Sequence, residues 1–480
     1  MQLKPLILTA GALAALSPLA GQTQKQTGQS DKRPNIIFIV TDQQSAVMMS
    51  CAGNTWLNTP GMDYIGNNGV RFTRAYTTNP VSSPARLGFM TGRFPGSFTD
   101  AGGNKADNNN TSMGIRNLSP EVLNTTIGAW LKRAGYDLVY GGKTHLPEQL
   151  MPKPQGFAVI SSDERDELAK SGADFIRERH DKPYYMVLSF INPHDICYMA
   201  ISDFGRGSRE AKEEKNPPIH IKMLEQAKKM PAGVTKEEFY AKWCPPLPPN
   251  YEIQEGEPKA IDNLISQAAF SFRKQAREHY TDEQWRLHRW TYCRLTEVVD
   301  AEVQQVVDAL KASGEEENTI VIFTADHGDM DASHRLEHKS LLYEQAANIP
   351  FVVMWKGHIV PRVDDKHLVS NGLDLLPTVC DYAGVKGGSD PRGLSLRPLL
   401  EGDNNTPWRK TLGVESEVGS MVVSADGCKY ARYDLGGIEE QIYDLNKDPY
   451  ETKHFTSDPN YKSKLAELRR DFDSVWFPNF

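Results

Sequence analysis

The sequence predicts an α/β fold in which helices sandwich one large, mostly parallel β-sheet, followed by a smaller C-terminal antiparallel-sheet subdomain. The first observation is a series of continuous apolar runs rich in β-branched residues, which are typical of strands buried on both faces. The second is a helical pattern between them, clearest from Leu295 to Ala312, which Ser313-Gly314 ends. The third is a change in the hydrophobic pattern after about residue 402, where short segments typical of antiparallel strands and turns replace the long apolar runs.

The apolar runs predict the strands in chain order: NIIFIV (35–40), DLVY (137–140), YYMVLSFI (184–191), TIVIFT (319–324) and IPFVVMW (349–355). A charge-rich and proline-rich stretch interrupts them at about 200–290. It predicts an insertion at the edge or mouth of the sheet, which either shapes a substrate site or elaborates the surface. The main domain is therefore expected over 33–402. A C-terminal α+β subdomain is expected over 403–480, closed by an amphipathic helix near 461–475.

The first residues read as an export signal rather than as part of the fold. Lys4 precedes an apolar run that ends near Ala20 and is too short and too interrupted to span a membrane. We predict a signal peptide over 1–20, with a disordered apolar terminus as the alternative, and a flexible lead-in over 21–32. No later segment is long and apolar enough to span a bilayer, so the protein is expected to be exported, either periplasmic or secreted.

Charge and cysteine content narrow the classes of function. The 480 residues carry a formal net charge of −8, which argues against a broadly basic nucleic-acid-binding face. An anionic substrate would therefore need a local cluster of cations. Six scattered cysteines without a Cys-x-x-Cys pair predict neither a disulfide scaffold nor a thiolate metal site.

Two of the predicted strands end in acidic residues. Thr41-Asp42-Gln43-Gln44 follows the first strand, and Asp326-His327 follows the strand that begins at Thr319. Ligands bind at the carboxyl ends of strands in such sheets, so both ends are expected to converge on one metal. Carboxylate and amide oxygens favour calcium, whereas an imidazole favours zinc or iron. Taken alone, Asp42 fits a helix N-cap equally well.

A proline-broken turn leads from Asn79 into a short predicted helix that places Arg86 one turn inside it. A hydroxyl at a helix N-terminus with an arginine above it is a plausible anion site. An ordinary serine N-cap is the alternative for an isolated Ser-x-Pro.

The segment Ser82-Ser83-Pro84-Ala85-Arg86, continued to Thr91-Gly92-Arg93, resembles the signature of formylglycine-dependent sulfatases. Five further blocks follow the family's order: RPNIIFIVTDQQ, AGYDLVYGGKTHL, NPHD, NTIVIFTADHGD with HRLEHKSLLYEQAANIPF, and IYDLNKDP. This resemblance to type I sulfatases of the alkaline phosphatase superfamily covers nearly the whole mature chain. It implies the alkaline phosphatase-like fold and a sulfuric ester hydrolase that acts on a sulfated carbohydrate.

The resemblance also implies a role for each matching residue. Ser82 would be oxidised to formylglycine, whose hydrate attacks sulfur with one hydroxyl and uses the other to expel sulfate. Arg86 would hold the diol, and Lys143 and Lys339 would neutralise the sulfate oxygens. His145 would assist proton transfers of the diol, and His194 would protonate the leaving oxygen. The positions that match ligands of a calcium ion are Asp42, Gln43, Ser82, Asp326 and His327.

Some positions depart from the usual family pattern. Serine replaces cysteine at position 82, which implies a serine-type anaerobic sulfatase-maturating enzyme as a partner. Gln43 stands where many relatives carry aspartate, and Thr144 replaces a tryptophan. His334 receives no catalytic role, and His338 is interpreted either as structural or as an outer support of the site.

Two other functions stay open at this point. One is a phosphatase or phosphonate monoester hydrolase on the same fold, because phosphate and sulfate share tetrahedral geometry. The other is a catalytically silent sulfoglycan-binding protein with an unmodified Ser82. The insertion and the stretch from Gly102 to Gly114 are either walls of the site, holding sugar hydroxyls, or plain surface loops.

Overall fold

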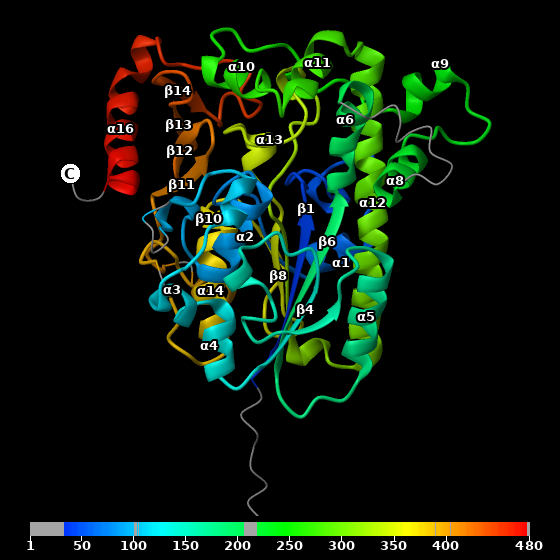
Figure 1. The fold of residues 1–480 in the computed structure, drawn as a ribbon, viewed down its shortest axis with the longest axis vertical. Coiled ribbons are helices and arrows are strands. Elements are labelled where there is room, and N and C mark those ends of the chain that lie inside the picture. The colour runs from blue at the N-terminus through cyan, green and yellow to red at the C-terminus, as the bar shows by residue number, and fades with distance from the viewer. Residues whose placement is uncertain are drawn as a thin grey trace, which may run out of the picture. The chain divides into compact units, whose positions relative to one another are not determined.

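An eight-stranded sheet runs through the computed structural model, which describes residues 33–99, 103, 105–205, 218–388, 390–403 and 405–477 (Figure 1). The predicted signal peptide and lead-in, and residues 206–217 of the predicted insertion, lie outside this described part. The strand order is β5-β4-β6-β1-β7-β8-β2-β9. The strands are β1 (Asn35–Asp42), β2 (Gly69–Phe72), β4 (Asp137–Gly142), β5 (Ala158–Ser161), β6 (Tyr184–Pro193), β7 (Thr319–Ala325), β8 (Phe351–Met354) and β9 (Arg362–Asp364).

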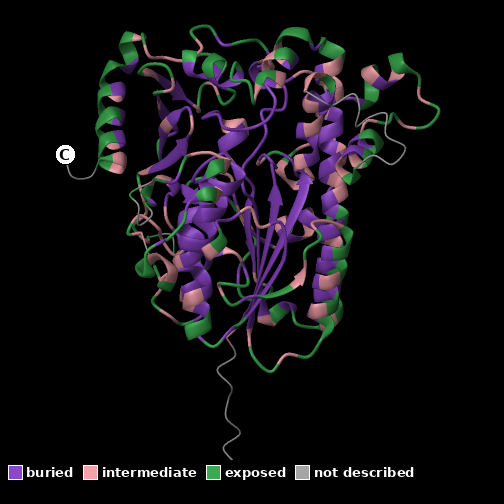
Figure 2. Cartoon of the chain, viewed as in Figure 1, coloured by how far each residue is buried: buried purple, intermediate pink, exposed green. Residues whose placement is uncertain are grey.

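Strand β1 lies between β6 and β7 and pairs in parallel with both. All three strands are buried along their whole length, as their continuous apolar runs predict (Figure 2). Strand β8 pairs with β7 in the antiparallel direction. The chain returns through residues 326–350 to the same end of the sheet instead of crossing it, so β8 has to run back. The prediction of a mostly parallel sheet is confirmed: β8 is its single antiparallel strand, because β2 and β9 beyond it again run in the direction of β7.

Alternate residues of β1 feed two different apolar cores. Ile37 and Ile39 pack with α1, α5 and α12, whereas Ile36 and Phe38 pack with α2, α4 and α14. Helices therefore cover both faces of the sheet, as predicted (Figure 1). Their bounds are α1 (Pro60–Asn67), α2 (Ser82–Thr91), α4 (Ile127–Arg133), α5 (Asp166–Arg177), α12 (Asp282–Ser313) and α14 (Asn371–Tyr382).

Helix α12 is longer than its apolar pattern indicates. It begins at Asp282, because Thr281 and Gln284 form a capping box, and it ends where Gly314 takes a left-handed φ of 75°. Its first turns thus occupy the end of the segment predicted as an insertion. Earlier in that segment lie α8 (Ile219–Ala227), α10 (Lys259–Ile265) and α11 (Ser271–His279). Helix α10 packs against the C-terminal sheet through Ile261 and Leu264.

The C-terminal strands form a separate antiparallel sheet in chain order: β11 (Thr411–Ser416), β12 (Gly419–Ser424), β13 (Cys428–Tyr433) and β14 (Glu439–Asp444). The closing helix α16 (Lys462–Trp476) covers one face of this sheet, with Leu465, Leu468 and Phe472 against Val422 and Tyr430. The predicted antiparallel subdomain and its closing helix are confirmed. Among the described residues, no helix has the length and apolar character that crossing a bilayer requires. The six cysteines are all unpaired.

Glu302 on α12 is a buried carboxyl whose two oxygens have no hydrogen-bond partner. Burial, with a smaller contribution from Asp166, raises the pKa of Glu302 to about 9. The unfolded chain ionises a glutamate near pH 4.5, so this residue costs stability increasingly as the pH rises from there toward 9. We expect Glu302→Met to raise the free energy of unfolding at pH 8 by about 2 kcal/mol and to flatten its pH dependence.

Chemical denaturation at pH 5 and pH 8 measures this effect. Asp308→Asn, an exposed acidic position on the same helix, is the control and should leave the pH dependence unchanged. An equal pH dependence for Glu302→Met and the wild type would contradict the assignment.

Candidate active site

The carboxyl ends of β1 and β7 and the N-terminus of α2 meet at one place. Asp42 is the last residue of β1, Asp326 directly follows β7, and Ser82 is the first residue of α2. Asp42, Asp326 and His327 are fully buried, and one potential ligand atom from each lies within 4.8 Å of the other two. The convergence that the strand ends predict is therefore present in the structure.

The Ser82 hydroxyl points into this cluster. Its Oγ lies 3.1 Å from His327 Nε2 and 3.3 Å from Asp42 Oδ2, and Lys339 Nζ donates to it at 3.4 Å. The N-cap position of α2 is Val81, and no side chain caps the helix. The N-cap alternative for Ser82 is therefore wrong, and its hydroxyl is available for chemistry.

Arg86 ties the two strand ends together. Its Nη2 donates to Asp42 Oδ2 and its Nε to Asp326 Oδ2, each at 3.0 Å. Nη1 donates to Ser189 Oγ at 2.7 Å and to the Lys143 carbonyl at 3.2 Å. Burial disfavours the guanidinium charge, but the two carboxylates outweigh it and raise the pKa of Arg86. Arg86 thus clamps the carboxylates in place rather than standing free for a substrate.

Lys143 and Lys339 reach the same cluster from two different segments. Lys143 Nζ lies 2.7 Å from Asp42 Oδ2, just after β4 ends at Gly142. Gly142 has a φ of 88°, and a Cβ there would meet the Ser189 carbonyl at 2.1 Å, so this turn requires glycine. Burial lowers the pKa of Lys339; attraction to Asp42 opposes this effect, and repulsion from Lys143 adds to it.

The charges of the cluster favour an anion. Arg86, Lys143 and Lys339 supply three cations against the carboxyls of Asp42 and Asp326. Burial alone would raise the pKa of Asp42, yet the cations Lys143, Lys339 and Arg86 hold it well below its usual range. Burial and the charge of Asp42 raise the pKa of Asp326. An acidic chain thus contains the local excess of positive charge that an anionic substrate needs.

Burial lowers the pKa values of all three site histidines. His327 Nδ1 lies 2.9 Å from the Gly328 carbonyl, which only accepts, so Nδ1 carries the proton and Nε2 keeps its lone pair. Burial lowers the pKa of His327, and Lys339 adds to the effect. His194 Nε2 lies 4.0 Å from Asp42 Oδ1, and burial lowers its pKa as well. Burial and Lys143 lower the pKa of His145 to about 3.

Gln43 completes a donor set that fits a divalent cation. Its Nε2 donates to Asp329 Oδ2 at 2.7 Å, while its Oε1 is buried without a hydrogen-bond partner. An unpaired buried amide oxygen is rare, and a bound ion explains it. Together with the two carboxylates and His327 Nε2, this oxygen supplies the ligand types that metal ions accept in proteins.

The loops that carry these residues hold unusual backbone conformations. Non-glycine residues with positive φ include Gln43 at 67°, His145 at 50°, His338 at 76° and Ser340 at 77°. Such conformations cost free energy and cluster at functional sites, where surrounding contacts maintain them. The loops after β1, β4 and β7 are therefore held in place by tertiary contacts.

The stretch from Gly102 to Gly114 borders the site in its described part. Asn110 Oδ1 accepts from the Ser83 backbone N–H at 3.2 Å, and Asn108 Oδ1 accepts from Asn79 Nδ2 at the same distance. The predicted insertion reaches the loop after β7, where the Asn250 carbonyl accepts from His334 N–H at 2.7 Å. Both segments therefore contact the parts of the chain that carry site residues.

Ser189, Tyr140 and Asp329 support the site, although the sequence alone predicted no role for them. Ser189 accepts from Arg86, and the Tyr140 hydroxyl donates to the Lys143 carbonyl at 2.7 Å. The signal for Ser189 was a lone polar residue inside an otherwise apolar strand. For Asp329, the signal was a second acid three residues after Asp326.

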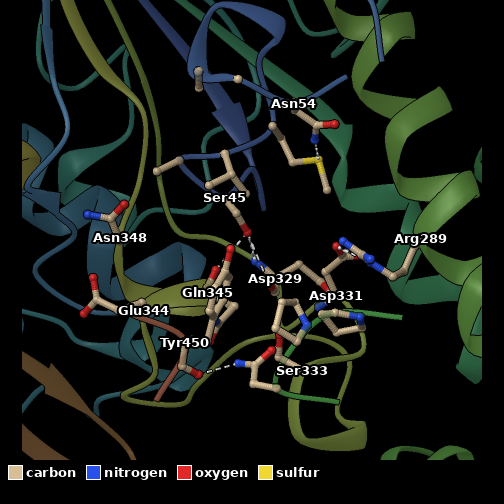
Figure 3. A pocket seen from close by; sticks show the side chains of 18 of the residues that line it. Ser45, Asn54, Arg289, Asp329, Asp331, Ser333, Glu344, Gln345, Asn348 and Tyr450 are labelled. Carbon is tan, nitrogen blue, oxygen red and sulfur yellow. Dashed lines mark hydrogen bonds and ion pairs between the residues drawn. The ribbon is translucent and has the colours of Figure 1, made fainter. Parts of the chain in front are cut away.

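A separate pocket of about 500 Å³ lies beside the loop after β7 (Figure 3). Its described lining includes Ser45, Asn54, Arg289, Asp331 and Gln345. Neither Ser82 nor any of the site lysines and histidines belongs to that described lining. The pocket therefore does not coincide with the cluster around Ser82.

Two protein-family models and several curated relatives match most of this chain. The Sulfatase family model matches residues 34–385, and the model named N-sulphoglucosamine sulphohydrolase, C-terminal, matches residues 332–476. The chain is 28% identical to a Delta 4,5-hexuronate-2-O-sulfatase of Bacteroides thetaiotaomicron over 93% of its length and 89% of the relative. It is 26% identical to an N-acetylglucosamine-6-O-sulfatase of the same organism, over 95% and 88% of the two chains.

Solved structures of sulfatases also resemble this chain. A structure described as a 2-O GAG sulfatase superposes with a TM-score of 0.74 at 26% identity, covering 92% of each chain. This neighbour shares the alkaline phosphatase-like architecture that the resemblance implied. Because the family match spans most of the sequence, the chain belongs to the sulfatase family and is a sulfuric ester hydrolase.

Proposed function

We propose that the chain is an exported sulfatase that removes sulfate from a carbohydrate, with a formylglycine made from Ser82 and a bound calcium ion. The observation that carries the proposal is the Ser82 hydroxyl, enclosed by Lys339, His327 and Asp42. The carbohydrate substrate follows from relatives named for hexuronate and N-acetylglucosamine sulfates.

Calcium is the proposed ion because most of the available ligands are oxygens. Asp42, Gln43, Asp326 and His327 would hold it, together with the group at position 82. Bound there, calcium supplies positive charge that polarises the sulfate.

Formylglycine, once formed, supplies a hydrated aldehyde as the nucleophile. The remaining chemistry is assigned to side chains of this chain. Lys143 Nζ and Lys339 Nζ bind the sulfate oxygens and stabilise negative charge as it grows. His194 takes up a proton as the negatively charged sulfate binds beside it and donates this proton to the leaving alcohol oxygen, while His145 accepts a proton released at position 82. Arg86 keeps both carboxylates in position throughout.

Mass spectrometry tests the modification directly. Trypsin releases residues 75–86, which include Ser82. In protein made with a serine-type anaerobic sulfatase-maturating enzyme, we expect this peptide to lack two hydrogens, with fragment ions that locate the loss at position 82. Protein made without the maturating enzyme is the control.

Activity and metal dependence are the second test of the same proposal. We expect the modified protein to release sulfate from sulfated monosaccharides and to lose this activity after calcium removal. An unmodified serine combined with turnover of phosphate esters in added zinc would instead establish the phosphatase alternative.

Export is tested by the N-terminus of the protein recovered from its host. We expect it to begin after about Ala20, because the signal peptide is proposed to be cleaved there. An intact N-terminus in the cytoplasmic fraction would overturn this part of the proposal.

A further inference from the structure

One buried acidic side chain, Asp329, joins two loops of the site, those after β1 and β7. Asp329 Oδ2 accepts from Gln43 Nε2 at 2.7 Å and from the backbone N–H of His338 at 3.0 Å. Its Oδ1 accepts from the backbone N–H of Asp331 at 2.7 Å. Ser45 Oγ donates to its carbonyl at 3.1 Å, so the loop after β1 also holds its backbone (Figure 3).

This contact determines which end of the Gln43 amide faces Asp329. Both Asp329 oxygens accept hydrogen bonds from backbone N–H groups, so the amide presents its NH₂ group to Asp329 Oδ2 and turns its oxygen away. The backbone of Gln43 has little freedom, because its N–H donates to Asp326 Oδ1 at 3.1 Å and Tyr292 OH donates to its carbonyl at 2.6 Å. The side-chain amide of Gln43 could still rotate, and its hydrogen bond to Asp329 prevents this rotation.

The other end of the amide is the buried oxygen that lacks a partner. Leaving Gln43 Oε1 unpaired costs free energy unless something in the site takes it up. Gln43 directly follows Asp42 and donates to Asp326, both of the proposed cation cluster. A cation bound between those carboxylates would supply the partner that this oxygen lacks.

We propose that Asp329 is a positioning residue that presents Gln43 Oε1 to the cation and ties the segment bearing Lys339 to the same point. His338 N–H bonds to Asp329, and the next residue is Lys339, whose Nζ donates to Ser82. One carboxylate thereby aligns a cation ligand and a sulfate-binding lysine. The inference rests on the cation site of the proposed function.

Calcium affinity, measured by isothermal titration calorimetry on the full protein with an unmodified Ser82, tests the inference without requiring activity. Asp329→Asn keeps the shape of the side chain but replaces an acceptor by a donor, so it cannot serve all three N–H groups. We expect calcium to bind about 10- to 100-fold more weakly, the usual effect of removing such a supporting group.

Asp300→Asn is the matched control. Asp300 is also a buried carboxylate that accepts two backbone N–H groups, those of Gly61 and Met62. It lies on α12 outside the cluster. We expect this variant to lower the Tm while leaving the calcium affinity unchanged, which separates lost stability from lost positioning.

A double-mutant cycle distinguishes positioning from a general structural role. Gln43→Leu removes the amide oxygen and should itself weaken calcium binding. If Asp329 acts through Gln43, then Gln43→Leu combined with Asp329→Asn binds calcium no more weakly than Gln43→Leu alone. Fully additive losses would overturn the inference.

Calcium binding by the wild-type protein separates the cation site itself from the role of Asp329. Wild-type protein that binds no calcium would overturn the cation site and, with it, the role of Asp329. Wild-type protein that binds calcium with the same affinity as Asp329→Asn would overturn the role of Asp329 alone.

Discussion

Replacing Ser82 by alanine will lower kcat/KM for sulfate release by about 10⁵-fold, a loss of the size caused by deleting a nucleophile. Ser82 Oγ is the oxygen at the point where His327 Nε2 and Lys339 Nζ meet. Alanine offers no atom to oxidise and none to attack sulfur. Sulfate release from a sulfated monosaccharide, measured on fully modified protein, is the readout.

Ser83→Ala is the matched control for this prediction. Ser83 is adjacent and equally buried, but its Oγ lies 2.8 Å from Ser112 Oγ and takes no part in the cluster. We expect its activity to stay within about threefold of the wild type, because an isolated hydroxyl pair contributes about 1 kcal/mol. Comparable activity of Ser82→Ala and Ser83→Ala would refute the assignment of the nucleophile.

Replacing Arg86 by methionine will both destabilise the protein and inactivate it. The change leaves Asp42 and Asp326 buried without the guanidinium that lies 3.0 Å from each. Removing one partner from a buried ion pair costs about 3 to 5 kcal/mol, because the remaining charge stays uncompensated. Urea denaturation in calcium-free buffer measures the loss.

Added calcium should restore part of this stability. A divalent cation compensates the same two carboxylates, so we expect calcium to raise the Tm of Arg86→Met more than that of the wild type. Arg409→Met is the control, because Arg409 pairs with buried Asp374 away from the site. It should lose stability and gain nothing extra from calcium. An equal calcium response in both variants would contradict the proposed cation site.

The central sheet could be predicted from the sequence because strands buried on both faces appear as continuous apolar runs. Each predicted apolar run corresponds to a strand, and the run at 35–40 became β1, from Asn35 to Asp42. The antiparallel direction of β8 was not accessible, because a buried strand has the same composition in either direction. The early start of α12 was signalled by Thr281 and Gln284 but hidden by the polar residues around them.

Asp42 and Asp326 were predictable as a pair from the sequence, since the carboxyl ends of neighbouring parallel strands meet at one edge of a sheet. The roles of Lys143, His145, His194 and Lys339 came from family resemblance, because isolated lysines and histidines carry no local signal. Their convergence near Ser82 and Asp42 is a property of the fold, which brings together the segments that follow β4, β6 and β7.

The sequence by itself therefore determined the elements, the two strand ends that carry acids, and the family. Periodicity and composition are local properties, and they record which residues are buried and in which kind of element. Only the tertiary structure decided the partners: Arg86 bonded to both carboxylates, Ser189 bonded to Arg86, and Asp329 bonded to Gln43. These hydrogen bonds join residues that lie between 44 and 286 positions apart in the sequence. Such pairings depend on the packing of the whole sheet and leave no trace in the spacing of residues along the chain.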